Sequence, residues 1–164
     1  MTAINSVTAN RSPSLHGLPV KKYAKLISEF LKQCDIELHD AEFMIIDGIE
    51  IPTQIEFSKH FEDVKLQGTV IGSVSEDQQV VEYEIWQTFE TEQFALQFEL
   101  IHGTETVSLY SYAPENLELR MQQSNNTIQS LQIFDQTSTE KLLCHMVRDT
   151  ECLNGQMPVF KRSN

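Results

Sequence analysis

The tightest grouping of reactive side chains in this sequence is Cys144, His145 and Cys152. Thiolates and imidazoles are preferred ligands of Zn²⁺ in proteins, so a zinc site is the first chemistry to consider. We expect a helix here, however, and the neighbouring residues 144 and 145 would then point to different sides of it. The grouping therefore predicts a packed cysteine beside an exposed histidine rather than a metal centre.

Carboxylate pairs such as Glu82 and Glu84 are a second candidate, because two carboxyl groups in a cleft can act as general acid and base. Here they fall in an acidic stretch that we interpret as a solvated face. The sequence holds no Gly-rich phosphate loop, nucleophile elbow or HExxH motif, and its five histidines are scattered over every segment. We therefore predict a protein that is not an enzyme and uses no metal or other cofactor.

The charge distribution points towards binding. The 164 residues include 24 acidic and 12 basic side chains, a net charge of -12, and no Lys or Arg lies between Leu66 and Leu119. Such a surface repels phosphate backbones, which argues against nucleic-acid binding, and it attracts basic partners.

Cysteine usage and hydropathy predict a location. Three cysteines without a CxxC pair argue against a disulfide framework and favour a reducing cytoplasm. The polar start of the chain lacks the apolar core of a signal peptide. No apolar run approaches the roughly 20 residues that a membrane-spanning helix needs. We expect a cytoplasmic protein with no membrane insertion.

The elements that would position these groups begin after a polar stretch, residues 1–18, which we interpret as a flexible arm. The next segment predicts an amphipathic helix, with Pro19 in a position that suits the first turn. Its apolar stripe consists of Val20, Tyr23, Ala24, Ile27, Phe30, Leu31 and Cys34.

Strands are predicted on both sides of the middle of the chain. Asp47-Gly48 between two apolar runs is typical of a two-residue hairpin turn, and Pro52 predicts an edge or a local irregularity in the second arm. A third strand is expected over 64–74. The alternation over 94–100 and the turn at His102-Gly103 predict a second hairpin.

Residues 76–89 fit two patterns. Their β-branched and aromatic residues favour a strand, whereas Ser75 and Gln78 have the spacing of a capping box that begins a helix. A helix would also place Trp86 on an apolar face, while a strand would leave it among glutamates. We favour the helix.

The C-terminal part predicts further helices. Near-heptad spacing predicts a long helix over 114–134, which Asn125, Asn126 and Thr127 could divide in two. Thr137 and Glu140 form another possible capping box before a short helix, and a loose tail starts at Gly155. The domain is therefore predicted to span 19–134, with a C-terminal extension over 135–164.

The resulting fold is α+β, an antiparallel five-stranded sheet with elements in the order α-β-β-β-α-β-β-α and a short extra C-terminal helix. This order resembles that of the class I chaperones of bacterial type III secretion systems. The matching segments are KKYAKLISEFLKQCDI, AEFMIIDGIEIPTQIEF, VKLQGTVIGSV, SEDQQVVEYEIWQTFE, FALQFELIHGTETVSLYSY and PENLELRMQQSNNTIQSLQIF.

The resemblance implies a homodimer that binds the N-terminal region of a secreted effector protein without ATP and keeps it extended and secretion-competent. The cargo-binding residues that it implies are Phe43, Ile45, Ile51, Ile55 and Phe57. The implied dimer interface is the face of the middle helix that carries Val81, Ile85, Trp86 and Phe89.

Two alternatives remain open. An immunity or inhibitor protein would use the acidic surface to neutralise a basic toxin by 1:1 binding. Alternatively, residues 76–112 would form a four-stranded meander around a small ligand, with Trp86 inside the cavity.

Overall fold

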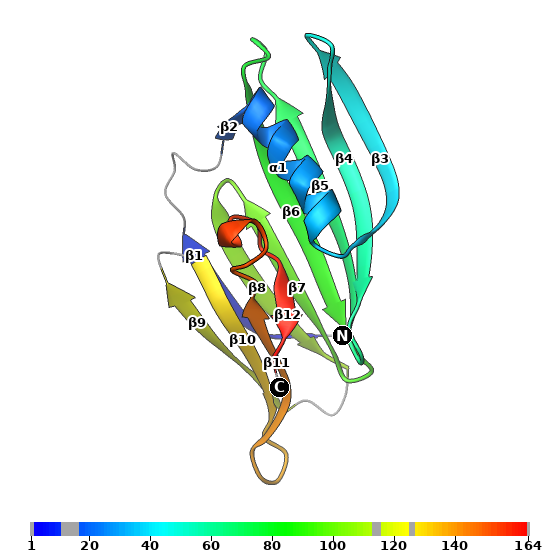
Figure 1. Ribbon diagram of the computed structural model, residues 1–164. Coiled ribbons are helices and arrows are strands. Elements are labelled where there is room, and N and C mark those ends of the chain that lie inside the picture. The colour runs from blue at the N-terminus through cyan, green and yellow to red at the C-terminus, as the bar shows by residue number, and fades with distance from the viewer. Residues whose placement is uncertain (1, 11–16, 113–115, 125–126, 164) are drawn as a thin grey trace.

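The computed structural model describes residues 2–10, 17–112, 116–124 and 127–163, with the backbone alone for residues 2–10 (Figure 1). Twelve β-strands, one α-helix and one short 3-10 helix form in these residues. The strands make two antiparallel sheets. The predicted α+β fold is therefore wrong: of the helices expected over 20–34, 76–89, 114–134 and 137–147, only the first is a helix.

The larger sheet, hereafter the main sheet, is a meander with one returning strand. Its spatial order is β1 (Thr2–Asn10), β8 (Thr104–Ser111), β7 (Phe94–Ile101), β6 (Val80–Glu90), β5 (Lys65–Val74), β4 (Ile49–His60) and β3 (Glu37–Ile46). The three-residue strand β2 (Gly17–Pro19) pairs with the beginning of β6. Part of the predicted N-terminal arm therefore forms β1 and β2, and its residues 1 and 11–16 lie outside the described residues.

The smaller sheet comes from the C-terminal third of the chain. Its spatial order is β12 (Phe160–Arg162), β11 (Lys141–Arg148), β10 (Thr127–Asp135) and β9 (Leu117–Ser124), and the 3-10 helix η2 (Leu153–Gly155) lies between β11 and β12. The long helix predicted over 114–134 is thus two paired strands, and the short helix predicted after Thr137 is β11. The segment predicted as an extension with a loose tail buries Met157, Val159 and Phe160.

Strand β6 shows how the main sheet divides inside from outside. Its alternate residues Val81, Ile85 and Phe89 are fully or almost fully buried, while Trp86 between them is 39% exposed. Consecutive strand residues point to opposite faces, so this alternation marks one covered and one open face. The predicted helix over 76–89 is wrong, and Trp86 lies among glutamates as the rejected strand interpretation required.

The polar residues that suggested a helix cap instead close the β5–β6 hairpin. The Ser75 hydroxyl accepts hydrogen bonds from the backbone N–H groups of Gln79 (3.3 Å) and Val80 (3.1 Å) and donates one to Asp77 (2.6 Å). A serine oxygen can satisfy backbone donors in a turn as well as at a helix start, so this local motif does not distinguish a hairpin turn from the start of a helix.

Helix α1 (Val20–Gln33) and the smaller sheet cover the same face of the main sheet (Figure 1). Tyr23 of α1 stacks at 5.9 Å from Tyr83, and Phe160 of β12 lies 6.2 Å from Phe89, both measured between ring centroids. Tyr83 and Phe89 both belong to the buried alternation of β6. We call the opposite, uncovered face the outer face.

Tyr23 also fixes the predicted irregularity at Pro52. The β4–β5 ladder begins only at Gln54 opposite Ile71, so the carbonyl of Pro52 lies beyond it and accepts a hydrogen bond from the Tyr23 hydroxyl at 2.7 Å. Gly72 leaves the space, since a Cβ there would lie 2.5 Å from the Tyr23 oxygen. The prediction of an irregularity at Pro52 is confirmed.

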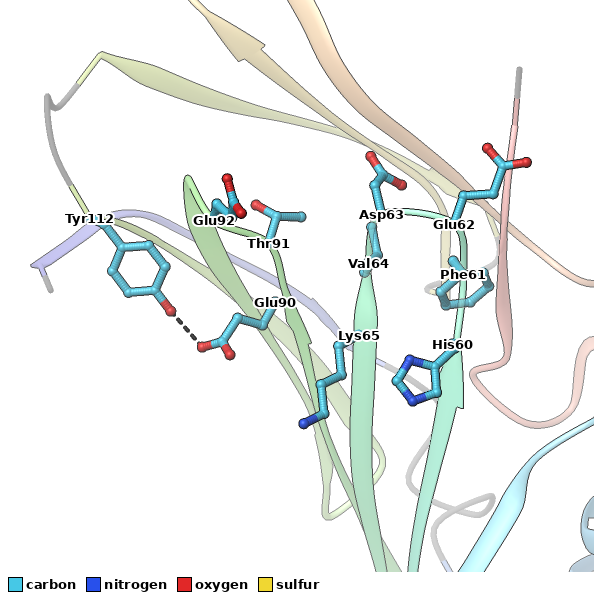
Figure 2. Close-up of a pocket in the computed structure, with 10 residues that line it drawn as sticks. All are labelled: His60, Phe61, Glu62, Asp63, Val64, Lys65, Glu90, Thr91, Glu92 and Tyr112. Atoms are coloured by element: carbon cyan, nitrogen blue, oxygen red, sulfur yellow. Dashed lines mark hydrogen bonds between the residues drawn. The ribbon is translucent and has the colours of Figure 1, made fainter.

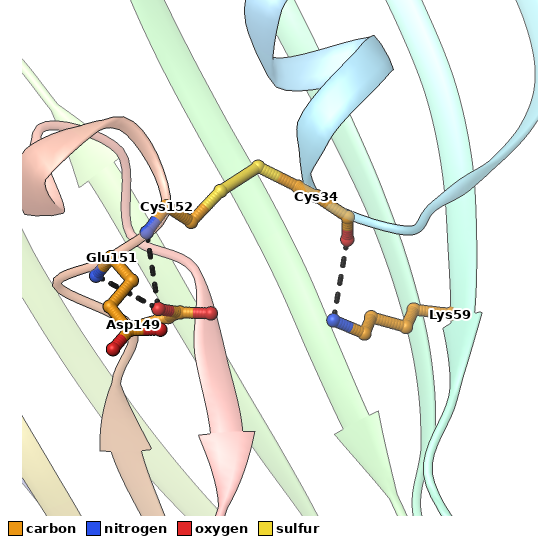
Figure 3. The surroundings of a disulfide bond; sticks show 5 residues. All are labelled: Cys34, Lys59, Asp149, Glu151 and Cys152. Carbon is orange, nitrogen blue, oxygen red and sulfur yellow. Dashed lines mark hydrogen bonds between the residues drawn. A yellow bond between two sulfur atoms is a disulfide. The ribbon is translucent and has the colours of Figure 1, made fainter.

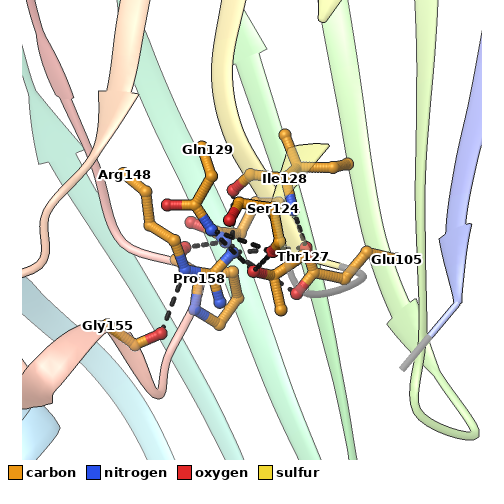
Figure 4. Close-up of polar contacts among 9 residues, drawn as sticks. Glu105, Ser124, Thr127, Ile128, Gln129, Arg148, Gly155 and Pro158 are labelled. Carbon is orange, nitrogen blue, oxygen red and sulfur yellow. Dashed lines mark hydrogen bonds and ion pairs between the residues drawn. The ribbon is translucent and has the colours of Figure 1, made fainter. Parts of the chain in front are cut away.

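A buried ion pair joins the two sheets (Figure 4). Arg148 of β11 and Glu105 of β8 approach to 3.2 Å with side-chain exposures of 2% and 0%. Glu105 also accepts a hydrogen bond from the Ile128 N–H at 2.9 Å, and Arg148 donates to the carbonyls of Ile128 and Gly155, each at 3.0 Å. These contacts tie β8, β10, β11 and η2 together.

A disulfide joins the end of α1 to the segment before η2 (Figure 3). Cys34 and Cys152 are bonded with their Cα atoms 6.3 Å apart, across a sequence separation of 118. The Cys34 carbonyl accepts a hydrogen bond from Lys59, and the Cys152 N–H donates to Asp149. The cysteine count argued against a disulfide framework, and the Cys34–Cys152 bond was therefore not predicted.

We expect Arg148→Met to lower the free energy of unfolding by about 3–5 kcal/mol, because it leaves the Glu105 carboxylate buried without its cation. Urea unfolding followed by circular dichroism measures the change. Arg120→Met is the matched control, since the ion pairs of Arg120 are exposed and should contribute about 0–1 kcal/mol. Equal losses in both variants would contradict this role, and Arg148→Met/Glu105→Leu should recover part of the loss.

Breaking the disulfide should lower stability by about 2–5 kcal/mol, because the bond closes a long loop in the unfolded chain. The measurement is urea unfolding of oxidised protein with and without dithiothreitol. The variant Cys34→Ser/Cys152→Ser should match the reduced protein and no longer respond to the reductant. A response that persists in this variant would rule the Cys34–Cys152 bond out as its source.

Tyr23 predicts a loss of stability at alkaline pH. Burial, with a smaller contribution from the neighbouring Tyr83, raises the pKa of Tyr23 far above its usual range. Its contribution to stability is therefore complete below the unfolded pKa of about 10 and is lost as pH rises from there towards the folded pKa, by about 1.4 kcal/mol per pH unit.

Tyr23→Phe should be about 1–3 kcal/mol less stable at pH 8, because the Pro52 carbonyl loses its donor. Between pH 10 and 11.5 its stability should fall less steeply than that of the wild type. Urea unfolding over this pH series measures both slopes, and lysines contribute equally to the two proteins. If the unfolding free energies of the two proteins fell in parallel with pH, Tyr23 would not be the source of the alkaline loss.

Candidate functional site

The thiol and imidazole grouping does not form a ligand set. The sulfur of Cys152 is bonded to Cys34, and Cys144 is packed inside, as predicted, with its sulfur 2.8 Å from a guanidinium nitrogen of Arg162. Burial raises the pKa of the Cys144 thiol. His145 points to the other side of β11. No group of three or more His, Cys, Asp or Glu side chains in the described ranges is placed to hold a metal ion.

The carboxylates Glu82 and Glu84 lie on the outer face of the main sheet, at positions that alternate with the buried residues of β6. Glu84 Oε2 accepts a hydrogen bond from the indole N–H of Trp86 at 3.4 Å. The two glutamates therefore stand on an open sheet surface, the solvated face that the sequence predicted.

An open hollow of about 500 Å³ lies at the end of the main sheet where the β4–β5 and β6–β7 connections meet (Figure 2). Tyr112 donates a hydrogen bond to Glu90 at 2.5 Å, and this bond raises the pKa of the Tyr112 phenol. The carboxylates of Glu62 and Asp63 point away from Glu90 (Figure 2). Because its acidic groups diverge, the hollow offers neither a metal site nor an acid–base pair.

The strongest candidate is the rim of the main sheet formed by β3, which we call the β3 edge. In the described part of the chain this ten-residue strand pairs only with β4, so its other side presents backbone N–H and C=O groups. Proteins usually shorten or cover such an edge, because it accepts a further strand. Figure 1 shows β3 at the rim of the sheet, away from α1 and the smaller sheet.

The β3 edge also carries exposed apolar side chains at its turn end. Phe43 is 50% exposed, Met44 41% and Ile45 69%. Phe43 and Ile45 share one face, opposite Pro52 and Glu50 of β4. Met44 lies on the other face, opposite the buried Ile51. Adjacent exposed apolar residues of this kind mark an interaction surface more often than isolated ones do.

Two irregularities shape this edge. The register between β3 and β4 shifts at His39 and again between Glu42 and Phe43. The first shift is fixed by a 2.6 Å hydrogen bond between His39 Nε2 and the Ser58 hydroxyl. Bulges increase strand twist and interrupt pairing, so they limit which strand can add here.

The surroundings of the β3 edge are acidic. Residues 37–58, which span β3 and most of β4, contain no Lys or Arg and six carboxylates, namely Glu37, Asp40, Glu42, Asp47, Glu50 and Glu56. A basic segment is the electrostatic complement of this rim.

The five residues predicted to bind cargo separate into two groups. Phe43 and Ile45 lie at the β3 edge, where a partner can reach them. Ile51, Ile55 and Phe57 are at most 2% exposed and belong to the core beneath α1. The predicted patch is therefore reduced to its first two members.

The four residues predicted to form a dimer interface do not share a surface. Val81, Ile85 and Phe89 are buried within the chain, and Trp86 stands on the outer face. The physical reason is the strand period of two, which replaces the helical stripe on which the grouping rested.

Sequence reasoning missed Leu38 and Met44, which are exposed at the same rim. The available signal was the uninterrupted run Phe43-Met44-Ile45-Ile46 before the Asp47-Gly48 turn. A half-buried strand alternates, so four consecutive apolar residues indicate that both faces of the strand meet apolar surroundings or a partner.

Comparison with family models, curated proteins and solved structures gave no match for this chain. Helix α1 has 14 residues, and no helix in the described residues is long and apolar enough to cross a membrane.

Proposed function

We propose that this protein is a binding protein that captures an extended, basic segment of a partner protein along the β3 edge. The observation that carries the proposal is the open side of β3, together with the exposed Phe43 and Ile45 beside it. Main-chain hydrogen bonds would hold the segment, and side chains at every second position would select it.

The side-chain pattern of the edge specifies the partner. Because Phe43 and Ile45 lie on one face of the hairpin and Met44 on the other, an added strand would meet apolar contacts on both of its faces near the turn. Farther along, Asp40 and Glu42 replace the apolar residues. The proposed segment therefore has apolar residues at one end and Lys or Arg at the other.

The acidic rim also argues for a different partner rather than a second copy. Pairing two β3 edges would bring their carboxylates together, and like charges placed opposite each other destabilise a ladder. The homodimer implied by the family resemblance stays a prediction, but the apolar stripe that carried it is buried in the chain.

The specific role of an effector chaperone also stays a prediction. It rested on an order of helices and strands that this chain does not have. Binding of an extended segment is supported independently by the β3 edge, and it needs neither that family nor a cofactor.

The disulfide supports a proposal about the compartment. A cytoplasmic location was predicted from the three cysteines without a CxxC pair and from the lack of a signal-peptide core or a long apolar run. The Cys34–Cys152 bond instead favours an oxidising compartment, because reducing systems in the cytoplasm keep most thiols reduced. We therefore propose that the protein works in an oxidising compartment, where this bond persists.

Ile45→Asp should weaken binding of an extended segment at least about tenfold, because it removes the most exposed apolar side chain of the edge and places a carboxylate against the apolar end of the segment. The probes are synthetic peptides selected from a phage-displayed library of about 12 residues, long enough to pair along the strand. We expect the selected peptides to carry apolar residues at one end and Lys or Arg at the other. Their affinity should fall as NaCl rises from about 50 to 500 mM.

Leu142→Asp is the matched control, since Leu142 is 46% exposed on β11 of the smaller sheet. Hydrogen exchange of the complex should show new protection of β3 amides. Equal peptide binding by the two variants, or new amide protection only outside β3, would contradict the proposal. Failure to select any peptide, together with 1:1 binding of a folded basic protein, would instead favour the inhibitor alternative, and a mass near twice 18.8 kDa without peptide would favour self-association.

A further inference from the structure

Trp86, the one tryptophan of the chain, stands on the outer face of the main sheet in the middle of β6. The largest aromatic side chains of the core, such as Phe89 and Phe98, are fully buried, yet this larger ring is 39% exposed. Its indole N–H donates to Glu84 at 3.4 Å, which orients the ring on the strand. An oriented, exposed indole presents an apolar plate with polar edges.

The side chains around Trp86 form two rows that cross the sheet. Strand pairing places Glu56, Thr69, Trp86 and Glu99 side by side in the first row. The second row, two residues farther along each strand, contains Gln67, Thr88 and Gln97, while Ser58 at its β4 end is buried and hydrogen-bonded to His39. Apart from the indole, every side chain in these rows is a hydroxyl, amide or carboxylate.

Hollows lie on both sides of the indole. One of about 470 Å³ is lined by Trp86, Thr69 and Gln67 together with His39 and Glu56. The other, of about 140 Å³, is lined by Trp86, Thr88, Gln97 and Glu99. Phe57 also lines the first hollow and Phe98 the second, so Trp86 is the ridge between two depressions of mixed polar and apolar lining.

We propose that these rows bind a neutral oligosaccharide, with one pyranose ring stacked on Trp86. A pyranose has an apolar C–H face that matches the indole and a rim of hydroxyls that both donate and accept hydrogen bonds, as amide, hydroxyl and carboxylate groups require. The rows contain no Lys or Arg, which disfavours phosphate or sulfate groups. They contain no aliphatic side chain besides threonine methyl groups, which disfavours lipids and apolar protein surfaces.

The spacing also suits a chain of sugars. Neighbouring strands lie about 4.8 Å apart and the two rows about 7 Å apart along the strands. These distances are comparable to the length of one pyranose, so the ring on Trp86 and its neighbour would each meet a different set of polar side chains.

The single tryptophan provides a direct test. Cellohexaose, chitohexaose, laminarihexaose and maltohexaose are titrated separately into the full chain while tryptophan emission is followed, because any emission change must come from Trp86. We expect at least one to give a saturable change with a Kd on the order of 0.1–1 mM. Trp86→Ala should weaken that binding at least about tenfold, measured by calorimetry.

Gln97→Leu should weaken binding without removing the indole, and it keeps the emission readout if Trp86→Ala folds poorly. Ile45→Asp at the β3 edge should leave sugar binding unchanged, which separates this proposal from the peptide-binding function. Absence of binding to all four sugars up to about 5 mM would overturn the proposal. So would a Trp86 emission change caused by the selected basic peptides and by none of the sugars, which would assign the face to protein binding.

Discussion

The ion pair between Glu105 and Arg148 is the constraint on which the arrangement of the two sheets depends. Removing two charges from water is costly, and here the cost is offset in part by hydrogen bonds to backbone groups of Ile128 and Gly155. Because these contacts join β8, β10, β11 and η2, the pair specifies one relative position of the sheets. That position brings Phe160 against Phe89 and Phe98, and it closes the inner face of the main sheet. The outer face and the β3 edge are left for binding.

Local signals in the sequence predicted those elements whose conformation is decided locally. The turns at Asp47-Gly48 and His102-Gly103 have positive φ at both residues, as a two-residue hairpin requires, and the amphipathic pattern of 20–34 is a helix. The helix prediction for 76–89 was wrong for two reasons. Ser75 satisfies backbone donors equally well in a turn, and residues spaced four apart lie on one face of a strand as well as on one face of a helix. Pairing with β5 on one side and β7 on the other decides the question, and that pairing is not local.

The site was predictable only in part, for a related reason. Met44 and Ile51 lie opposite each other on one face of a hairpin, yet Met44 is 41% exposed and Ile51 is fully buried. The difference arises from strand order, since β4 lies between β3 and β5 while β3 has a neighbour on one side only. Likewise, nothing near Glu105 in the sequence indicates that its cation lies 43 residues away.

The two proposed binding regions belong to one sheet, and their separation follows from its geometry. Trp86 on β6 is three strands from the free side of β3, or about 14 Å at ordinary strand spacing. A segment added at the β3 edge would lie in the plane of the sheet, whereas a sugar would lie on its outer face, so neither would occupy the space of the other. The sheet between them is covered on its inner face by α1, which the Cys34–Cys152 bond attaches to the C-terminal segment. A rigid support of this kind keeps both regions preformed, so little ordering of the protein opposes binding at either.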